Sequence, residues 1–237
     1  MTQSPSFPPL LAGLAAPPGE VPFLLARDQA RGGCDAGLIV HDMEGGALRA
    51  AIVFAPEVPL SRAVAMLPLC AVGLQNAIGA LSPPEVGMHL DWDGGLRLNG
   101  ALCGRMRAAT STQDPKEVPD WLVVGFELTV LPANDAPGET PDETSLYGEG
   151  CGDVDTLTLL ESWVRHTLVW INRWADEGAG PLHREWSGLA WHADKEVRQG
   201  ELQGKYLGID EDFGLLMRAE DGTSHLIPMT RLLETDS

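Results

Sequence analysis

The sequence predicts an α+β protein, with a mixed β-sheet that has helices on one face and a small β-barrel after it. Three observations predict this fold. Short apolar strands alternate with two long segments of helical spacing, so helices and strands share one core. Asn99-Gly100 is a strong turn signal between two strand-like segments. Beyond residue 195, four short strands follow one another at near-even spacing.

The first half of the chain predicts two helices and two strands. Residues 21–31 have a helical pattern that ends at two glycines. Residues 37–41 and 48–54 are short apolar runs with turn residues between them, which predicts two strands. Apolar residues at helical spacing predict a helix over residues 60–81, with a kink at Pro68.

The second half predicts the hairpin, a long strand, a capped helix and the small barrel. The hairpin joins residues 96–98 to a return strand from Leu102, and residues 121–131 form the long strand. After a loop over residues 132–152, Asp155 caps a helix that ends at Gly178. The barrel strands are expected over residues 195–199, 202–209, 215–218 and 224–228.

Composition limits the classes of partner. The 237 residues include 16 Lys+Arg and 34 Asp+Glu, which gives a formal net charge of −18. Such a charge disfavours nucleic acid and anionic membranes as partners, because both attract basic surfaces. Residues 1–20 are expected to be an extended leader without the pattern of a signal peptide. No apolar run is long enough to span a membrane, so we expect a cytoplasmic protein.

Cysteine, histidine and tryptophan residues favour structural roles over a metal or cofactor site. The four cysteines are widely spaced, and we expect reduced thiols and no metal site. His41 and His89 could converge near a pocket, but no metal-ligand spacing links them. Five tryptophans at helical spacing are more typical of a core than of a cofactor site: Trp163, Trp170, Trp174, Trp186 and Trp191.

Residues 87–107, GMHLDWDGGLRLNGALCGRMR, resemble the central segment of biotin protein ligases and their lipoate ligase relatives. In that family, a Lys-Trp-Pro-Asn-Asp strand leads through a turn to a strand with another lysine and a glycine pair. Here Trp92 matches the family tryptophan, Asp91 stands at the first lysine, and Ala101 falls at the second. Asp93-Gly94-Gly95 replaces Pro-Asn-Asp.

The order of elements resembles the same family over roughly residues 22–233. Residues 123–130 resemble the family strand that ends in Asn-Val, with Thr129 at the asparagine, and residues 143–146 resemble its Ala-Thr-Ser-Leu. Residues 201–233 resemble the SH3-like domain appended to bacterial biotin ligases. The resemblance implies a class II synthetase-like α+β domain over residues 21–192 and an SH3-like domain over residues 193–237.

The family activates a small carboxylic acid with ATP and passes the acyl group to a protein lysine. Fixed cations must neutralise the phosphate oxygens in that chemistry. In this chain both lysines are absent, and the family's long Gly/Arg-rich loop is replaced by the short acidic segment 42–46. Three missing cationic features predict that adenylation is altered or lost. We expect no bound cofactor, and ATP with Mg only if the protein is an active ligase.

Two charged pairs could still carry chemistry. Arg105 and Arg107 point the same way on a strand, and they could replace the lost lysines by holding a carboxylate in a bidentate fork. The alternative is a surface strand that faces acidic residues. Asp91 and Asp93 could share a proton, bind a divalent cation or act as a general base. Such alternating aspartates are more typical of a solvated strand edge.

The glycines of these strands leave room for a ligand. We expect a small organic acid such as biotin, lipoate or an acyl-like compound, with its carboxylate on Arg105 and its chain beside Trp92. A docking surface for a carrier domain is the other role that the family scaffold could retain. The alternatives are an active ligase or acyltransferase that uses Arg105 and Arg49, and an interaction module without a ligand. No catalytic residue is assigned; the expected ligand-binding residues are Asp91, Trp92, Gly94, Gly95, Gly104, Arg105, Gly125 and Thr129.

Overall fold

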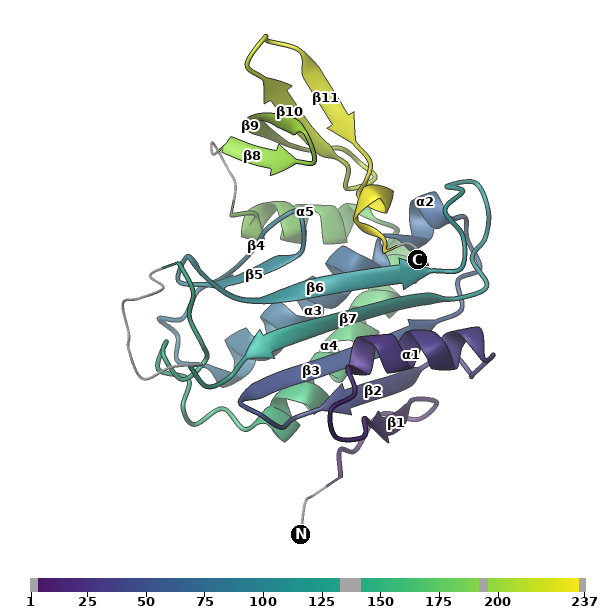
Figure 1. Ribbon diagram of the computed structural model, residues 1–237, viewed down its shortest axis with the longest axis vertical. Helices are drawn as coiled ribbons and strands as arrows, with labels where there is room; N and C mark the ends of the chain where they lie inside the picture. The colour runs from purple at the N-terminus through teal and green to yellow at the C-terminus, as the bar shows by residue number, and fades with distance from the viewer. Residues whose placement is uncertain (1–3, 133–141, 192–195, 235–237) are drawn as a thin grey trace.

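The structure is a computed structural model, and it describes residues 4–132, 142–191 and 196–234. Seven strands form one mixed sheet in the order β1-β2-β3-β7-β6-β5-β4, in which β1 and β2 are parallel and the other neighbours antiparallel (Figure 1). The elements of this first part are β1 (Ala12–Ala15), α1 (Pro22–Arg31), β2 (Leu38–Asp42), β3 (Ala47–Phe54), α2 (Leu60–Ala63), α3 (Met66–Leu81), β4 (Met88–Leu90), β5 (Gly95–Leu98), β6 (Ala101–Thr110), β7 (Leu122–Thr129), α4 (Thr156–Glu177) and α5 (Gly180–Leu189).

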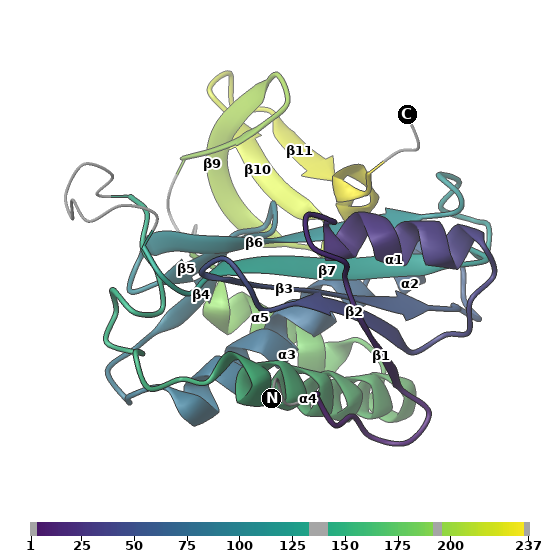
Figure 2. The ribbon, with the colours of Figure 1, turned by 60° about the horizontal axis from the view of Figure 1, so that its bottom comes forward.

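The helices cover both faces of this sheet, whereas we expected them on one face. α3, α4 and α5 lie on one side and α1 lies on the other (Figure 2). α1 packs there because Phe23, Ala26 and Ala30 share a buried cluster with Val40 of β2 and Val123 of β7. The prediction of an α+β fold with a mixed sheet is confirmed, and the position of α1 corrects it.

The segment 1–20 was expected to be an extended leader, but part of it belongs to the sheet. The backbone N–H of Ala12 donates to the carbonyl of Gly37 at 3.1 Å, and that of Ala16 donates to His41 at 2.8 Å. These bonds place β1 at the sheet edge as a parallel neighbour of β2. Residues 1–3 lie outside the described part of the chain.

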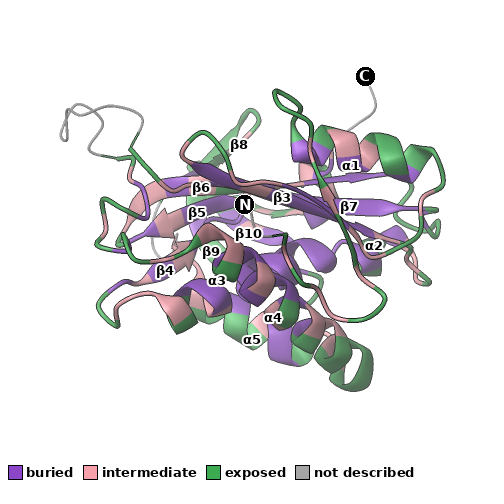
Figure 3. Ribbon diagram, turned by 90° about the horizontal axis from the view of Figure 1, so that it is seen from below, coloured by how far each residue is buried: buried purple, intermediate pink, exposed green. Residues whose placement is uncertain are grey.

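The predicted helix over residues 60–81 is divided in two. α2 ends at Ala63 and α3 begins at Met66, so the break precedes Pro68 rather than lying at it. Pro68 stands in the first turn of α3, where its missing N–H leaves no intrahelical bond unmade. We expected no apolar run long enough to span a membrane, but among the described residues Leu60–Leu81 has that length and composition. Its most apolar part is 72% buried within the protein, as in the core helix of a folded domain. Figure 3 shows α3 buried along most of its length.

The hairpin and the capped helix agree with the sequence. Asn99 and Gly100 have φ angles of 48° and 98°, as a two-residue hairpin turn requires. The side chain of Asp155 accepts a hydrogen bond from the Thr158 N–H, and Gly178 ends α4. The helix α5 and the final 3₁₀ turn η1 (Met229–Leu232) were not predicted.

The prediction that the five tryptophans belong to the core is confirmed for three of them. Trp163, Trp170 and Trp186 are buried, whereas Trp174 and Trp191 are partly exposed. All four cysteines are free, and burial raises the pKa of Cys103 to about 12. The described cysteines therefore behave as structural thiols.

The C-terminal part forms a four-stranded antiparallel sheet, consistent with an SH3-like domain. Its order is β11-β10-β9-β8, with β8 (Glu196–Gln199), β9 (Leu202–Ile209), β10 (Leu215–Ala219) and β11 (Ser224–Ile227). Several hydrogen bonds join it to the part of the chain that forms the main sheet. The Trp92 indole N–H donates to the Phe213 carbonyl at 2.8 Å, and the Glu234 N–H donates to Ala108 at 2.8 Å. The expected boundary at residues 192 and 193 lies outside the described residues.

Candidate functional site

A row of charged side chains crosses the face of the main sheet that carries α1. Asp42, Arg49, Glu127 and Arg105 stand opposite one another on β2, β3, β7 and β6, and we call them the ionic row. Strand alternation places Arg105 on the same face as Arg107, whose guanidinium lies 4.4 Å from the Phe23 ring centre of α1. The row therefore lies on the α1 face.

Arg49 is held on both sides within this row. Its guanidinium lies 3.2 Å from an Asp42 carboxylate oxygen and 2.8 Å from a Glu127 oxygen. Partial burial lowers the pKa of Arg49, but hydrogen bonds to Glu127 and Asp42 and the charges of those carboxylates together raise it above its ordinary value. Arg49 was the second arginine proposed for an active ligase, and here its charge is balanced within the chain.

The segment between β2 and β3 is the short acidic turn that the sequence predicted. Asp42 accepts a hydrogen bond from the Glu44 N–H at 3.0 Å, which closes the start of the turn. Gly45 and Gly46 both have positive φ, so their glycine identity serves the turn. The Gly46 carbonyl accepts from Val130 at 2.9 Å, so this backbone group is already engaged.

Asp91, which stands where the family lysine is expected, is paired with an arginine that sequence reasoning missed. The Arg97 Nε donates to both carboxylate oxygens of Asp91, at 2.9 and 2.8 Å, and its Nη1 donates to the Gly100 carbonyl at 3.0 Å. The Asp91 side chain is only 6% exposed. The available signal was the position of Arg97, on the strand that follows Asp91 through a tight turn.

Asp91 and Asp93 do not share a site as the proton-sharing hypothesis requires. The Asp93 carboxylate accepts a long bond from the Gly95 N–H at 3.4 Å and lies 3.8 Å from Arg105. The two carboxylates are thus divided between Arg97 and Arg105. The interpretation of a solvated strand edge holds for Asp93, whose side chain is 40% exposed, and is wrong for Asp91, which is buried.

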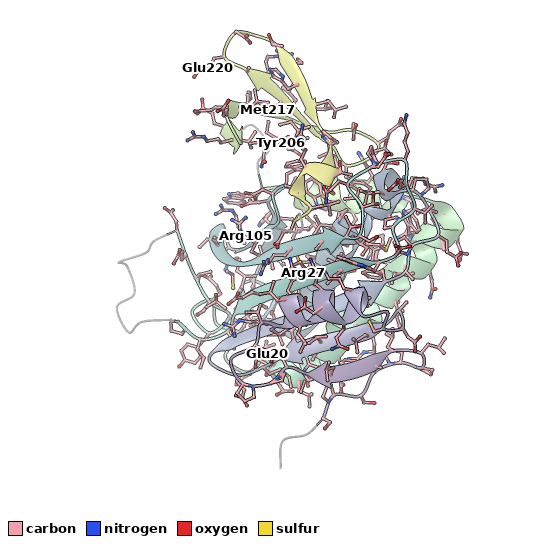
Figure 4. The ribbon with its side chains drawn as sticks, turned by 45° about the vertical axis from the view of Figure 1, so that its right-hand side comes forward. Glu20, Arg27, Arg105, Tyr206, Met217 and Glu220 are labelled. Carbon is pink, nitrogen blue, oxygen red and sulfur yellow. The ribbon has the colours of Figure 1, made fainter. Side chains whose placement is uncertain are left out.

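Arg105 and Arg107 lie in very different surroundings although they are two residues apart. The Arg105 side chain is 54% exposed and makes one long ion pair, to Asp93 (Figure 4). Arg107 donates through Nε and Nη2 to the two carboxylate oxygens of Glu234, at 2.6 and 2.9 Å. This hydrogen bonding raises the pKa of the Arg107 guanidinium. Both arginines thus face acidic residues of the chain, as the alternative interpretation expected, and Arg107 forms a bidentate fork with one of them.

The four glycines expected to leave room for a ligand are closely approached by other parts of the chain. A side-chain carbon at Gly94 would lie 2.8 Å from the Met106 carbonyl oxygen, and one at Gly95 would lie 2.5 Å from the Asp91 carboxylate. At Gly104 it would overlap the carbonyl of Glu127, and at Gly125 it would lie 2.9 Å from the Phe23 ring. Each glycine therefore has a packing role in this conformation.

A small cavity collects half of the expected residues. Asp91, Trp92, Gly94 and Gly95 line it, and its volume is about 10 Å³. That volume holds about one water molecule, whereas small-molecule pockets are typically about 300–1,000 Å³. The lining also includes the side chains Leu67, Leu96, Met106, Trp186 and Met229.

The other four expected residues, Gly104, Arg105, Gly125 and Thr129, are not among the described residues that line this cavity. The Thr129 carbonyl accepts hydrogen bonds from the Leu146 N–H at 2.9 Å and the Cys103 thiol at 3.4 Å. The structure therefore brings the expected set together only in part.

The two histidines do not converge. His41 lies on β2 and His89 on β4, and the sheet order places β3, β7, β6 and β5 between them. The His89 ring lies 5.1 Å from the Trp191 ring, while His41 meets Phe7 at 6.3 Å. The described residues contain no group of three or more His, Cys, Asp or Glu side chains arranged to hold a metal ion.

The arginines of the candidate site are engaged by carboxylates of the chain. Arg49, Arg97, Arg105 and Arg107 each lie within 4 Å of a carboxylate oxygen of the chain. A bound phosphate would have to displace at least one of these carboxylates, and it would meet the others as like charges. Of these four arginines, Arg105 has the longest and most exposed ion pair.

Comparison with known families identifies two regions of the chain. A family model described as the biotin/lipoate A/B protein ligase family matches residues 7–188. A second model, described as a domain of unknown function (DUF4444), matches residues 195–235. The two matches follow the division between the seven-stranded and four-stranded sheets.

Curated relatives include the bifunctional ligase/repressor BirA of two Bacillus species. The protein from Bacillus spizizenii is 23% identical over 221 residues, which are 90% of this chain and 65% of the relative. The protein from Bacillus subtilis is 22% identical over 224 residues, with the same coverage. The chain spans about 65% of the length of these relatives.

Solved structures share the fold. A biotin protein ligase-like protein of unknown function from Silicibacter sp. TM1040 is 56% identical, with a TM-score of 0.92 and coverage of 98% of this chain and 100% of that one. Biotin protein ligase from Aquifex aeolicus in complex with biotin and ATP is 15% identical, with a TM-score of 0.68 and coverage of 92% and 94%. The second likeness extends to the fold and not to the sequence.

Proposed function

Since this chain belongs to the biotin/lipoate A/B protein ligase family, we propose that it is a member that has lost ATP-dependent adenylation. Its retained role is to bind a small carboxylic acid or to dock a carrier domain. One observation carries this proposal: the arginines of β3, β5 and β6 that could replace the missing lysines are paired with carboxylates of the chain itself. Adenylation needs such cations to neutralise phosphate oxygens as charge develops.

The two retained roles make different demands on the protein. An acid bound beside Trp92 requires the cavity of about 10 Å³ to open, because a biotin-sized ligand needs a far larger volume. A docked carrier domain needs only an accessible surface, and Glu127 and Arg105 of the ionic row are already exposed. The first role therefore involves a conformational change, and the second does not.

An active ligase or acyltransferase is the second candidate function. The observation that favours it is the weak pairing of Arg105, whose side chain is 54% exposed and 3.8 Å from Asp93. A ligand phosphate could recruit this arginine at small cost, because exposed ion pairs contribute about 0–1 kcal/mol. Arg49 is a poorer partner, since it pairs with both Asp42 and Glu127.

The experiment is a nucleotide and acid titration of the purified protein. The Aquifex aeolicus relative has been solved with biotin and ATP, so these are the first ligands to test, followed by lipoate and octanoate. A ligand at a hundred times its dissociation constant adds about 2.7 kcal/mol of stability, which a melting curve detects readily. We expect no shift with Mg-ATP and no release of pyrophosphate with any acid. An active biotin protein ligase assayed in parallel serves as the positive control.

A melting shift that requires Mg-ATP, together with acid-dependent pyrophosphate release, would contradict the proposal and favour the ligase. In that case Arg105→Met is the informative variant. Loss of the ATP-dependent shift in this variant would assign the compensating charge to Arg105.

A further inference from the structure

The fork between Arg107 and Glu234 joins two segments that are far apart in the sequence. Arg107 lies on β6, and Glu234 follows η1 near the end of the described chain (Figure 1). Two hydrogen bonds of 2.6 and 2.9 Å connect the guanidinium to both carboxylate oxygens. An arginine binds the carboxylate of a small acid with this same bidentate geometry.

We propose that Arg107 is the carboxylate anchor of this protein and that Glu234 is an internal competitor that occupies it until a small organic acid takes its place. The inference rests on the acid-binding role proposed above, but it places the acid on the α1 face, whereas the cavity beside Trp92 lies on the opposite face with Met106. It moves the anchor from Arg105, which the sequence suggested, to the arginine two residues later. It also assigns to the C-terminal part a function in controlling the site.

The surroundings of Arg107 suit the carboxylate and the apolar body of such a ligand. Its guanidinium stacks on the Phe23 ring of α1, and stacking fixes the plane of the fork. On β7 the residue opposite Arg107 is Gly125, which has no side chain and is covered by Phe23. Movement of that ring would uncover Gly125 next to the fork, where a side-chain carbon would also lie 2.9 Å from the Ala50 carbonyl oxygen and 3.0 Å from the Ala51 side chain of β3. Arg105 has no comparable support.

α1 offers a second guanidinium on the same side of the helix. Arg27 follows Phe23 by four residues, which is one helical turn. Its Nε is buried and has no hydrogen-bond partner among the described residues. An unmade bond at a buried donor has a cost that a ligand oxygen would remove.

The Glu234 side chain can leave without undocking the C-terminal part. Its backbone N–H is bonded to the Ala108 carbonyl at 2.8 Å, and the preceding Leu233 is buried. Those contacts do not depend on the carboxylate, which is 32% exposed at its side chain. The Arg107 side chain is 36% exposed, so solvent and ligands can reach the fork. A rotation of the Glu234 side chain is therefore sufficient to free Arg107.

Glu234→Gln tests the inference with a neutral side chain of the same shape. The probes are octanoate, lipoate and biotin, added without nucleotide to the full chain and measured by calorimetry. We expect at least one acid to bind Glu234→Gln ten times more tightly than it binds the unchanged protein. Glu220→Gln is the matched control, because Glu220 is an exposed glutamate of the same small domain (Figure 4). It should leave acid affinity unchanged.

Arg107→Met in the Glu234→Gln background should abolish the gained affinity, whereas Arg105→Met in that background should preserve it. A gain that survives Arg107→Met would overturn the anchor, and a folded Glu234→Gln protein with no gain for any acid would overturn the competitor. Should the variants unfold, an NMR titration of the unchanged protein replaces them. Octanoate should then shift the Arg107 Nε–H signal, and the absence of any shift at saturating acid would overturn the inference.

The same variants separate this inference from the proposed function. Pyrophosphate release by Glu234→Gln with Mg-ATP and acid would contradict the loss of adenylation and leave the anchor intact. Failure of acid binding in every variant, with no response to ATP, would overturn the anchor and leave the carrier-docking role. The two failures thus have different readouts.

Discussion

The two faces of the seven-stranded sheet are made by alternate residues of the same strands, yet they are stabilised differently. On β7, Val124, Phe126 and Leu128 are buried against the helices α3, α4 and α5. The residues between them, Gly125 and Glu127, face α1 and the ionic row. One face is an apolar core, and the other combines a small apolar cluster under α1 with ion pairs. The difference separates the part of the sheet that stabilises the fold from the part that carries the ionic row.

The apolar face depends on burial, which scales with the area removed from water. The charged face depends on pairing, which contributes little at exposed positions and much when one partner is buried. On both faces, a substitution should therefore lower the free energy of unfolding more when the residues it affects are more deeply buried. Four experiments on stability order the two faces by size of effect.

The largest effect on stability is expected from Trp163→Ala, on the face of the sheet that carries α3, α4 and α5. Trp163 is fully buried, its indole N–H donates to the Cys70 carbonyl at 3.1 Å, and its ring meets Phe126 at 4.9 Å. Removal of the ring should lower the free energy of unfolding by about 3–5 kcal/mol. Urea denaturation measures it. Val169→Ala on the same helix is the control, since Val169 is 61% exposed and the change should be within about 0.5 kcal/mol.

A loss of about 3 kcal/mol is expected for Arg97→Met, because it leaves the buried Asp91 carboxylate without its main ionic partner. The loss should shrink in the double variant Asp91→Asn with Arg97→Met, which removes the charge as well. If the single variant is as stable as the unchanged protein, the pair is not buried in solution as the structure has it. The same geometry predicts that Asp91→Lys is destabilising, since it places a second cation beside Arg97. That variant is therefore a poor means of restoring nucleotide affinity.

Most of the fold could be predicted from the sequence, because local patterns determine it. Asn99-Gly100 specified the hairpin turn, Asp155 specified the start of α4, and four short apolar runs specified the small sheet. α1 could be predicted as a helix but not placed. Its position depends on which face of the sheet has apolar residues free to meet Phe23, and that requires the strand order.

The candidate site could be predicted only in part, because its chemistry depends on long-range pairs. The sequence indicated the missing lysines, the acidic turn at residues 42–46 and a bidentate arginine on β6. It could not indicate that Arg107 meets Glu234, which is 127 residues away, or that Phe23 covers Gly125. Neither contact leaves a local periodic signal. The glycine positions were identified, but whether a ligand or the chain fills the space beside a glycine is a tertiary property.

A smaller effect is expected from the pH dependence of stability that His41 causes, on the face of the sheet that carries α3, α4 and α5. Burial lowers the pKa of His41 below its ordinary value of 6.5, although Asp42 opposes the shift. The unfolded chain therefore binds a proton that the folded chain resists. This contribution to stability is fully present above about pH 6.5 and is lost as the pH falls through that value toward the folded pKa. His41→Gln should lose less stability between pH 7 and pH 5 than the unchanged protein loses.

His166 also has a lowered pKa, through burial and Arg165, but it is common to both proteins in that comparison and its contribution cancels. Denaturation at both pH values measures the difference. An equal loss in the two proteins would show that His41 is protonated in the folded state at pH 5, contrary to its buried position.

The smallest effect is expected from Arg105→Ala on the exposed part of the ionic row. Arg105 and Arg97 are both arginines on neighbouring strands, and each faces an aspartate of the same turn. They differ in the burial of that aspartate, whose side chain is 40% exposed in Asp93 and 6% exposed in Asp91. Water already solvates Asp93, so the free energy of unfolding should change by no more than about 0.5 kcal/mol. Urea denaturation at low and high salt measures this change in the free energy of unfolding. A loss as large as that of Arg97→Met would mean that Arg105 holds the sheet together rather than standing free for a ligand. The α1 face would then be a structural surface. Arg105 would no longer be a loosely paired cation that supports an active ligase.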